Sequence, residues 1–373
     1  MRVLHFYKTY KPDSMGGVEQ MIWHICDGAA ARGIRSDVLT VSRNTTTVDL
    51  GSHLHHRAKV TIDIASSPFS VSAFRHYREL VRDADIVHYH FPWPFADMVH
   101  LTARTGKPSV VTYHSDIIRQ KNLLKVYRPL MLRFLDSVTR IVATSPNYVD
   151  TSPVLQRYRD KVDVVPIGID EAAYPRATDA TLARWRREIG GKFFLFVGNL
   201  RYYKGLHLLL DALHGTDHRV VIVGAGPMEQ ELKAQARRLG VEGQLLFTGA
   251  SPDEDKIALL ELCEALVFPS HLRSEAFGIS LLEASMFGKP MVSMEIGTGT
   301  SFVNVNGETG LVVPLGDTPA LRNALDTLSN DPALAARFGA AARQRYEARF
   351  TADKMVDGYI EIYERVLRER QPA

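Results

Sequence analysis

The sequence repeats one local pattern along its length: a short run of β-branched and other apolar residues, followed by an amphipathic segment long enough for a helix. Continuous apolar strands that alternate with helices are typical of parallel sheets covered on both faces. The expected strands lie at residues 3–7, 85–90, 109–113, 140–144, 162–166, 193–197, 219–223, 244–247, 265–268, 291–294 and 311–313. The pattern therefore predicts an α/β fold built on parallel sheets.

The strands form two series that meet at residues 165–170, where one strand ends in proline and glycine and a polar stretch follows. A chain of 373 residues also exceeds what one hydrophobic core usually fills. We therefore expect an N-terminal domain of residues 1–170 and a second domain of residues 171–352. Residues 353–373 follow as a C-terminal helix.

Composition excludes several classes of protein. The net charge of +3 is too small to predict nucleic-acid binding, although residues 1–170 carry an excess of basic side chains that suits an anionic acceptor or surface. The only two cysteines, Cys26 and Cys263, form no metal-binding pattern and fit a reducing compartment. With no bilayer-length apolar run and no secretory signal pattern, we expect a cytoplasmic protein.

The strongest motif contains two glutamates, Glu275 and Glu283, on either side of Gly278. A helix that starts near Gly278 would offer free backbone N–H groups and a positive dipole end to a diphosphate. Glu275 could accept hydrogen bonds from sugar hydroxyls, and Glu283 could accept two from a ribose diol. The alternative is an ordinary amphipathic helix with two solvated glutamates.

This segment resembles the Glu-x7-Glu signature of retaining glycosyltransferases of family 4, which have the GT-B fold, and the resemblance covers nearly the whole chain. It implies two Rossmann-like domains that face each other across a cleft. It further implies that the nucleotide-sugar donor lies mostly on the second domain, the acceptor mostly on the first, and that the last helix crosses back to the first domain. The implied donor contacts include Phe277, Gly278, Ile279 and Glu283.

A glycine pair between the first strand and its helix, Gly16 and Gly17, resembles the family's Gly-Gly loop, which faces the donor phosphates. Glycines that open a helix suit close approach by a phosphate. Many turns between a strand and a helix contain glycine for steric reasons only, so the pair alone is a weak signal.

Residues 196–205 resemble the family's Gly-Arg-Leu…Lys-Gly segment, whose cations bind the diphosphate. Lys204 matches the family's lysine. Asn199 stands where arginine is usual, and Arg201 follows two residues later, so we expect Arg201 to supply part of the missing charge. A pair of surface cations on a loop is the alternative.

His114 follows a buried strand and resembles the family's active-site histidine. A histidine at the carboxyl end of a strand can hydrogen-bond a sugar hydroxyl. Residues 114–120, including Asp116 and Arg119 on the acceptor side, resemble mannosyl- and rhamnosyltransferases of O-antigen synthesis. Residues 295–301 show the same resemblance.

Two further motifs are weaker. Gly224 and Gly226 begin like a dinucleotide fingerprint, but Glu229 occupies the third glycine position, so a nucleotide-contacting turn fits better than an NAD site. Asp253 and Asp255 have the spacing of a metal-binding Asp-x-Asp. They open a helix, however, so capping and dipole complementarity explain them.

The segment from Arg119 to Arg140 interleaves cations with large apolar residues. A basic amphipathic helix of this kind can lie on an anionic membrane, and the lipid-linked acceptor that the resemblance implies favours this. The alternative is a core-facing helix with a solvated basic back.

The resemblance implies a retaining hexosyltransferase, and because protein cations and a helix start face the leaving group, we expect it to need neither metal nor cofactor. The resemblance implies transfer of mannose or D-rhamnose from a GDP-sugar to a polyprenyl-diphosphate-linked saccharide, as in O-antigen synthesis, at the inner face of the cytoplasmic membrane. The expected catalytic residues are His114, Glu275, Lys204 and Arg201. The alternatives are a UDP-sugar donor, a nucleotide-sugar epimerase of the same fold, an NAD-dependent oxidoreductase, and a non-catalytic scaffold.

Overall fold

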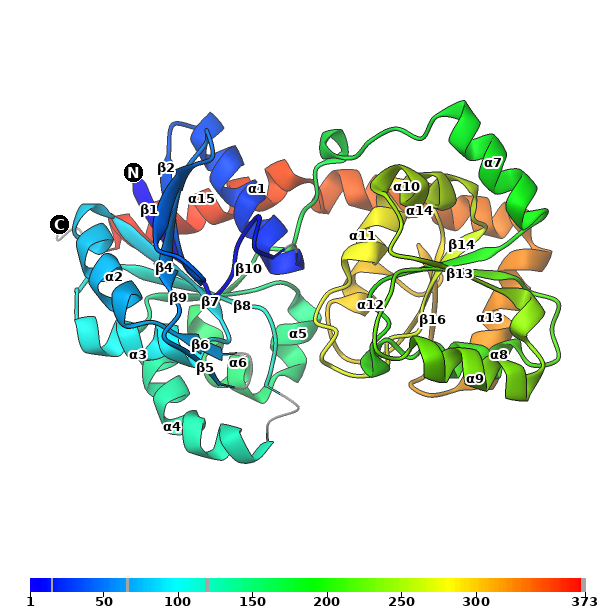
Figure 1. Ribbon diagram of the computed structural model, residues 1–373, viewed down its shortest axis with the longest axis horizontal. Helices are drawn as coiled ribbons and strands as arrows, with labels where there is room; N and C mark the ends of the chain where they lie inside the picture. Colours follow the sequence, from blue (N-terminus) through cyan, green and yellow to red (C-terminus); the bar gives the residue numbers. More distant parts are fainter. Residues whose placement is uncertain (15, 65–66, 118–120, 370–373) are drawn as a thin grey trace. The chain divides into compact units, whose positions relative to one another are not determined.

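A computed structural model describes residues 1–14, 16–64, 67–117 and 121–369, and the chain divides into two compact units (Figure 1). Unit 1 comprises Met1–Gly168 and Ala352–Ala373, and unit 2 comprises Ile169–Thr351. The predicted domain divisions lie after residues 170 and 352. Each unit has its own sheet, so each is described by itself.

The sheet of unit 1 has eight strands in the order β10-β9-β8-β7-β1-β2-β4-β3, and all neighbours are parallel except β3 and β4. A separate antiparallel pair is formed by β5 and β6. The strands of unit 1 are β1 (Arg2–Phe6), β2 (Arg35–Ser42), β3 (Thr46–Asp49), β4 (Leu54–Lys59), β5 (Ile62–Ile64), β6 (Ser67–Phe69), β7 (Ile86–Phe91), β8 (Ser109–Tyr113), β9 (Arg140–Ala143) and β10 (Val162–Val164). Its helices are α1 (Gly17–Ala31), α2 (Val71–Asp83), α3 (Pro94–Ala103), α4 (Lys121–Ser137), α5 (Pro146–Thr151), α6 (Pro153–Arg157), a 3-10 turn η1 (Arg159–Lys161) and α15 (Ala352–Arg368).

The sheet of unit 2 has six strands in the order β13-β12-β11-β14-β15-β16, all parallel. Its strands are β11 (Phe194–Val197), β12 (Val220–Val223), β13 (Leu245–Gly249), β14 (Ala265–Phe268), β15 (Met291–Met294) and β16 (Gly310–Val313). Its helices are α7 (Asp179–Ile189), α8 (Leu206–Leu213), α9 (Glu229–Leu239), α10 (Asp253–Leu262), α11 (Ile279–Met286), α12 (Thr300–Val303), α13 (Thr318–Asn330) and α14 (Pro332–Arg349), with 3-10 turns η2 (Glu171–Ala173), η3 (Tyr202–Lys204) and η4 (Glu242–Gln244). The predicted α/β fold with two Rossmann-like domains is confirmed.

Apart from the antiparallel edge strand β3, strand order reverses once in each sheet, and these positions locate the candidate sites. In unit 2 the chain runs outward from β11 through β12 and β13, then returns to build β14, β15 and β16 on the other side. In unit 1 the corresponding reversal lies between β1 and β7. Ligands of open parallel sheets bind beside the carboxyl ends of the strands at such a reversal, because the two loops there diverge to opposite faces.

The C-terminal helix α15 packs in unit 1, where it runs against α1 (Figure 1). The hydroxyl of Tyr363 lies 2.6 Å from Nδ1 of His88, and that of Tyr359 lies 2.8 Å from Oγ1 of Thr112. Both tyrosines are fully buried. The last helix therefore completes the core of unit 1, as the family resemblance implies.

The described residues contain no helix that is both long and apolar enough to cross a membrane.

Candidate active site

The central feature of unit 2 is a buried ion pair between two residues that the sequence had assigned separate roles. Lys204 ends the 3-10 turn after β11, and Glu275 lies in the loop after β14, so both occupy the reversal in strand order. Lys204 Nζ lies 2.5 Å from Glu275 Oε2, and each residue is only 9% exposed. Ser270 donates a further hydrogen bond of 3.2 Å to the same carboxylate oxygen.

The pair keeps Lys204 charged in spite of its burial. Burial lowers the pKa of this ammonium, but the adjacent Glu275 carboxylate, with a smaller effect of Tyr203, raises it on balance. Lys204 Nζ also lies 4.9 Å from the ring centroid of Phe268, the last residue of β14. A fixed cation at the end of a central strand can bind a phosphate group.

The helix predicted to start near Gly278 is α11. Gly278 is its N-cap, at φ +95°, and no side chain caps the helix. The N–H of Leu281 donates a hydrogen bond of 3.1 Å to the carbonyl of Gly278, so the N–H groups of Ile279 and Ser280 are the ones that remain for an anion. A Cβ at this glycine would lie 3.0 Å from the ring of Phe268 as well as in a strained conformation. Phe277 is buried beside it, and Ile279 is the first helical residue. A cation, a carboxylate and an uncapped helix start thus come together at one sheet edge.

Residues 295–301, the second segment that resembles O-antigen transferases, pack against the Glu275 loop. Arg273 donates a hydrogen bond of 2.7 Å to the carbonyl of Gly297, and Gly299 donates one of 2.9 Å to Ala276. Gly299 has no room for a side chain, because a Cβ there would lie 2.4 Å from the ring of Phe277. The two segments therefore support each other's shape.

The loops after β11 and β12 are also joined. Leu200 donates a hydrogen bond of 3.0 Å to Ala225, and a Cβ on Gly226 would lie 2.7 Å from Oδ1 of Asn199. Gly224 is equally constrained, because its Cβ would lie 2.1 Å from the carbonyl oxygen of Gly198. These glycines allow the loops to touch, which is a packing role beside the predicted nucleotide contact.

Arg201 is exposed and makes no ion pair with any of the residues that the structure describes. Its guanidinium is therefore available to an anionic ligand, as its predicted role requires.

Glu283 is less free than the sequence suggested. Its Oε1 lies 2.9 Å from Nζ of Lys256 and accepts a hydrogen bond of 3.2 Å from Tyr174. The pKa of Lys256 is lowered by burial but raised on balance by Glu283 and Asp253. Lys256 and Tyr174 were missed, since Lys256 stands in a helix whose acidic start had been explained by capping and dipole complementarity alone. One carboxylate oxygen remains for a ribose diol.

The two residues with the Asp-x-Asp spacing, Asp253 and Asp255, lie in the first turn of α10 together with Glu254. Asp255 accepts a hydrogen bond of 3.0 Å from Trp185 and pairs with Arg184, while Asp253 lies 3.1 Å from Lys256. The N-cap, Pro252, makes no side-chain cap, so the dipole explanation applies and the capping explanation does not.

In unit 1, Gly16 is the N-cap of α1 and Gly17 its first residue. The buried carboxylate of Glu19 lies against this turn: a Cβ on Gly16 would be 2.5 Å from Glu19 Oε2. Thr9 donates a 2.7 Å hydrogen bond to the other oxygen. Glu19 thus covers one side of Gly16, and the predicted phosphate contact of this loop stays a prediction.

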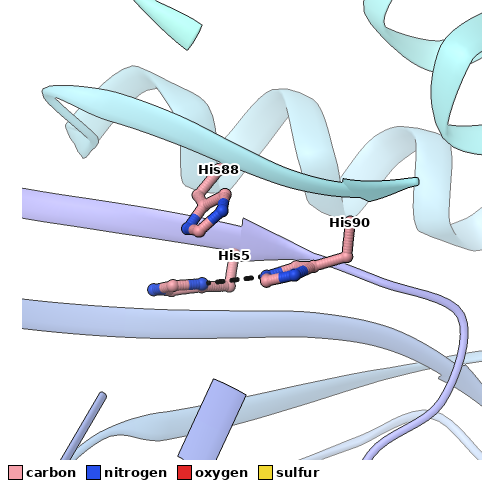
Figure 2. A group of neighbouring side chains, drawn as sticks. All are labelled: His5, His88 and His90. Carbon is pink, nitrogen blue, oxygen red and sulfur yellow. Dashed lines mark hydrogen bonds between the residues drawn. The ribbon is translucent and has the colours of Figure 1, made fainter. Parts of the chain in front are cut away.

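His114 directly follows β8 and is part of a chain of imidazoles at the reversal of unit 1. His114 Nε2 lies 3.1 Å from His90 Nδ1, and His90 Nε2 lies 3.3 Å from His5 Nδ1. Figure 2 shows His5 on β1 and His90 on β7 joined by this second bond, with His88 beside them. Burial lowers the pKa of His5 and of His114 to about 3, and that of His90 well below its usual value. These imidazoles are therefore neutral at pH 7.

Three of these histidines could in principle hold a metal ion, since ring nitrogens of His5, His88 and His90 lie within 4.8 Å of one another. Their hydrogen bonds oppose this. Both nitrogens of His88 are bonded to hydroxyls and both nitrogens of His90 to imidazoles. A metal would have to displace these partners, and we assign the cluster no ion.

The structure describes one of the two predicted acceptor-side residues, Asp116, but not the other, Arg119. Asp116 accepts hydrogen bonds from Tyr113 (2.9 Å) and Ser152 (2.7 Å), so it anchors the loop after β8 to the start of α6. Its predicted contact with the acceptor stays a prediction. Arg119 lies outside the described residues.

The helix α4 exposes both apolar and basic side chains. Val126 is 79% and Leu123 49% exposed, and Lys125, Arg128 and Arg133 are exposed as well. The opposite side is core: Tyr127, Met131 and Phe134 are buried. Both predicted aspects of the helix, a core-facing side and a basic apolar face, are therefore present.

Comparisons with known proteins identify the family and the fold. The family described as "Glycosyltransferase Family 4" matches residues 15–173, and "Glycosyl transferases group 1" matches residues 180–345. The D-rhamnosyltransferase WbpZ of Pseudomonas aeruginosa is 56% identical, over 94% of this chain and 93% of its own. The O-antigen chain mannosyltransferase C of Escherichia coli is 48% identical, over 99% and 100%. Sucrose-phosphate synthase from Thermosynechococcus elongatus has the same fold, with a TM-score of 0.82 at 18% identity over 99% of both chains.

Proposed function

Because the chain belongs to glycosyltransferase family 4 and is a hexosyltransferase of lipopolysaccharide O-antigen synthesis, we propose that it moves mannose or D-rhamnose from a GDP-sugar to a polyprenyl-diphosphate-linked saccharide, with retention of configuration. The relatives named as D-rhamnosyl- and mannosyltransferases supply the two candidate sugars. The single observation that carries the donor site is the buried Lys204–Glu275 pair beside the uncapped start of α11.

In this proposal the groups of the site stabilise the charges that develop during the reaction. Breaking the anomeric bond leaves positive charge on the sugar and negative charge on the departing diphosphate. Lys204, Arg201 and the first-turn N–H groups of α11 stabilise the leaving group, and preorganised charges of this kind are usually the largest catalytic contribution. Glu275 accepts hydrogen bonds from the sugar hydroxyls, and Glu283 from the ribose.

Retention follows from a front-face route, which the family resemblance suggests. The acceptor hydroxyl attacks from the side that the diphosphate leaves, and a donor phosphate oxygen takes its proton. Protein cations carry the leaving-group charge here, so we propose that no metal or other cofactor is required. His114 on unit 1 binds the reacting sugar, and Asp116 and Arg119 serve the acceptor.

The acceptor's lipid brings the enzyme to the inner face of the cytoplasmic membrane. The exposed Val126 and Leu123 stand among the cations of α4, as on helices that lie in a bilayer interface. Arg140 is not available for this contact, because it pairs with Glu369 at 2.6 Å.

A calorimetric titration tests which nucleotide, GDP or UDP, the donor site binds. We expect GDP to bind tightly and UDP at least tenfold more weakly, and GDP-mannose and GDP-D-rhamnose to be turned over with a saccharide acceptor. Tight UDP binding without GDP binding would favour the UDP-sugar alternative. Isomerised donor without transfer, in the same assay, would indicate an epimerase.

A further inference from the structure

The three hydrogen-bonded imidazoles of His5, His90 and His114, called the imidazole chain below, restrict which ring nitrogen of His114 can carry its proton. A neutral imidazole carries one N–H and one lone pair. His90 uses both nitrogens, so it donates in one of its hydrogen bonds and accepts in the other. The two bonds must therefore run in the same direction, and only two proton arrangements satisfy them both.

In the first arrangement all three residues carry their proton on Nε2. His114 then donates to His90, His90 donates to His5, and the Nε2–H of His5 has no partner within the imidazole chain. In the second arrangement all three carry it on Nδ1. His5 then donates to His90, His90 donates to His114, and the Nδ1–H of His114 is free to donate to a group outside the imidazole chain.

The buried end of the chain selects between them. His5 Nε2 is inaccessible to solvent and has no hydrogen-bond partner among the residues that the structure describes. The first arrangement would leave an N–H there without an acceptor, whereas the second leaves only a lone pair without a donor. Among backbone groups, buried N–H groups without an acceptor are rarer than carbonyl oxygens without a donor, and we apply the same preference to this ring nitrogen.

We propose that His5 and His90 are positioning residues that hold His114 as the Nδ1–H tautomer, so that it offers a fixed N–H hydrogen-bond donor to an oxygen of the substrate. This rests on the proposed role of His114 at the transfer site. Its neutral state agrees with the low pKa of all three rings, which their burial causes. The rings are also held in place, since His90 stacks on both His88 and His114.

The test combines a tautomer measurement with activity. In the full chain labelled with 15N-histidine, two-bond 1H–15N spectra distinguish a protonated from an unprotonated ring nitrogen, and loss of a signal in His114→Ala assigns His114. We expect protonated Nδ1 and bare Nε2. A His114 found with its proton on Nε2 overturns the proposal without touching the family assignment.

Matched variants of His90 separate positioning from folding. His90→Leu removes the N–H that faces His114, and we expect His114 to shift toward the Nε2–H form and kcat to fall about tenfold, with KM for the sugar nucleotide little changed. His90→Asn places an amide N–H where Nδ1 was and should restore both. His100 is a half-buried histidine that bonds Tyr89 and Ser137 instead, so His100→Leu should keep the wild-type tautomer of His114.

Two results would count against the proposal. If His90→Leu leaves the proton on Nδ1 of His114, the chain does not set the tautomer. If His114→Ala keeps full turnover, His114 has no part in transfer, and the positioning role fails while glycosyl transfer itself stands. Should His90→Leu not fold, His5→Leu and His5→Asn provide the same comparison one step along the chain.

Discussion

At the scale of single residues, the pairing of Lys204 with Glu275 links binding to stability. Two ionised groups share a site that is about one-tenth exposed, and each is costly to bury without the other. The pair also orients both groups before substrate arrives. A phosphate that approaches Lys204 and a sugar that approaches Glu275 therefore meet side chains that are already fixed.

The isosteric Glu275→Gln variant should lose turnover and stability together. Loss of a charge-assisted acceptor, worth about 1.5–3 kcal/mol, predicts a turnover about 10- to 150-fold lower. Because the variant leaves Lys204 buried and unpaired, its free energy of unfolding should fall by about 3–5 kcal/mol. Steady-state kinetics and urea unfolding measure the two effects.

A double variant separates these effects. Lys204→Met combined with Glu275→Gln removes both charges, so we expect it to regain most of the lost stability while its turnover stays low. Full activity in either variant would remove Glu275 from the proposed site.

The sequence predicted these residues but not their contact. The Glu-x7-Glu spacing pointed to Glu275, and the Lys-Gly step pointed to Lys204, each from its local motif. Their ion pair depends on β11 and β14 being neighbours, which no local pattern encodes. The imidazole chain was missed for the same reason, although the alternation of His88 and His90 along one strand was a visible signal.

At the scale of elements, the acidic first turn of α10 is a feature that helix electrostatics explains. Its carboxylates already have partners within unit 2, among them Lys256, Trp185 and Thr181. We expect turnover in excess EDTA to stay within about twofold of the untreated enzyme. Loss of activity that magnesium or manganese restores would instead identify Asp253 and Asp255 as ligands.

The helix α4 gives a second prediction at this scale. Reversal of Lys121, Lys125, Arg128 and Arg133 to glutamate should release the protein from anionic vesicles, since each cation near the surface contributes on the order of 1 kcal/mol. High salt should do the same to the wild type. Turnover on a short soluble acceptor should change little, because the proposed donor site is built from residues of unit 2, whereas these four residues belong to unit 1. A wild type that does not sediment with anionic vesicles at low salt would contradict this.

Elements were predictable where their residues were apolar. The β-branched runs located the strands on which both reversals depend, whereas β2 and β4 were not predicted. Both contain buried or half-buried polar side chains that hydrogen-bond one another across the sheet: His55 with Thr40 at 2.8 Å, and His56 with Asp37 at 2.9 Å. In a sequence, a polar residue of this kind argues against a buried strand, because the hydrogen-bond partner that permits its burial lies on another strand.

At the scale of the whole molecule, the two units differ most in their histidines. Burial lowers the pKa of seven histidines of unit 1: to about 3 for His5 and His114, to about 4 for His53, His55 and the half-buried His100, and well below the usual value for His88 and His90. In unit 2, the pKa of His207 and of His271 is lowered as well, but both are only half-buried.

The sign of the resulting pH dependence is fixed. Between about pH 3 and 6.5 an unfolded histidine binds a proton that its buried counterpart does not, so the free energy of unfolding falls as pH is lowered through that window. The loss approaches about 1.4 kcal/mol per pH unit for each such histidine, and the stabilisation is fully present only above pH 6.5. Unit 1 should therefore loosen in mild acid before unit 2.

Amide hydrogen exchange at pH 7 and pH 5, corrected for the intrinsic effect of pH, locates this loss. We expect β1, β7 and β8 to lose protection at pH 5 while β11 and β14 keep theirs. His100→Phe removes one titrating ring at a site away from the imidazole chain, and it should make the pH dependence of unit 1 less steep. Equal loss of protection in both units would show that burial of these histidines does not control acid stability, since unit 2 lacks a comparable buried set among its described residues.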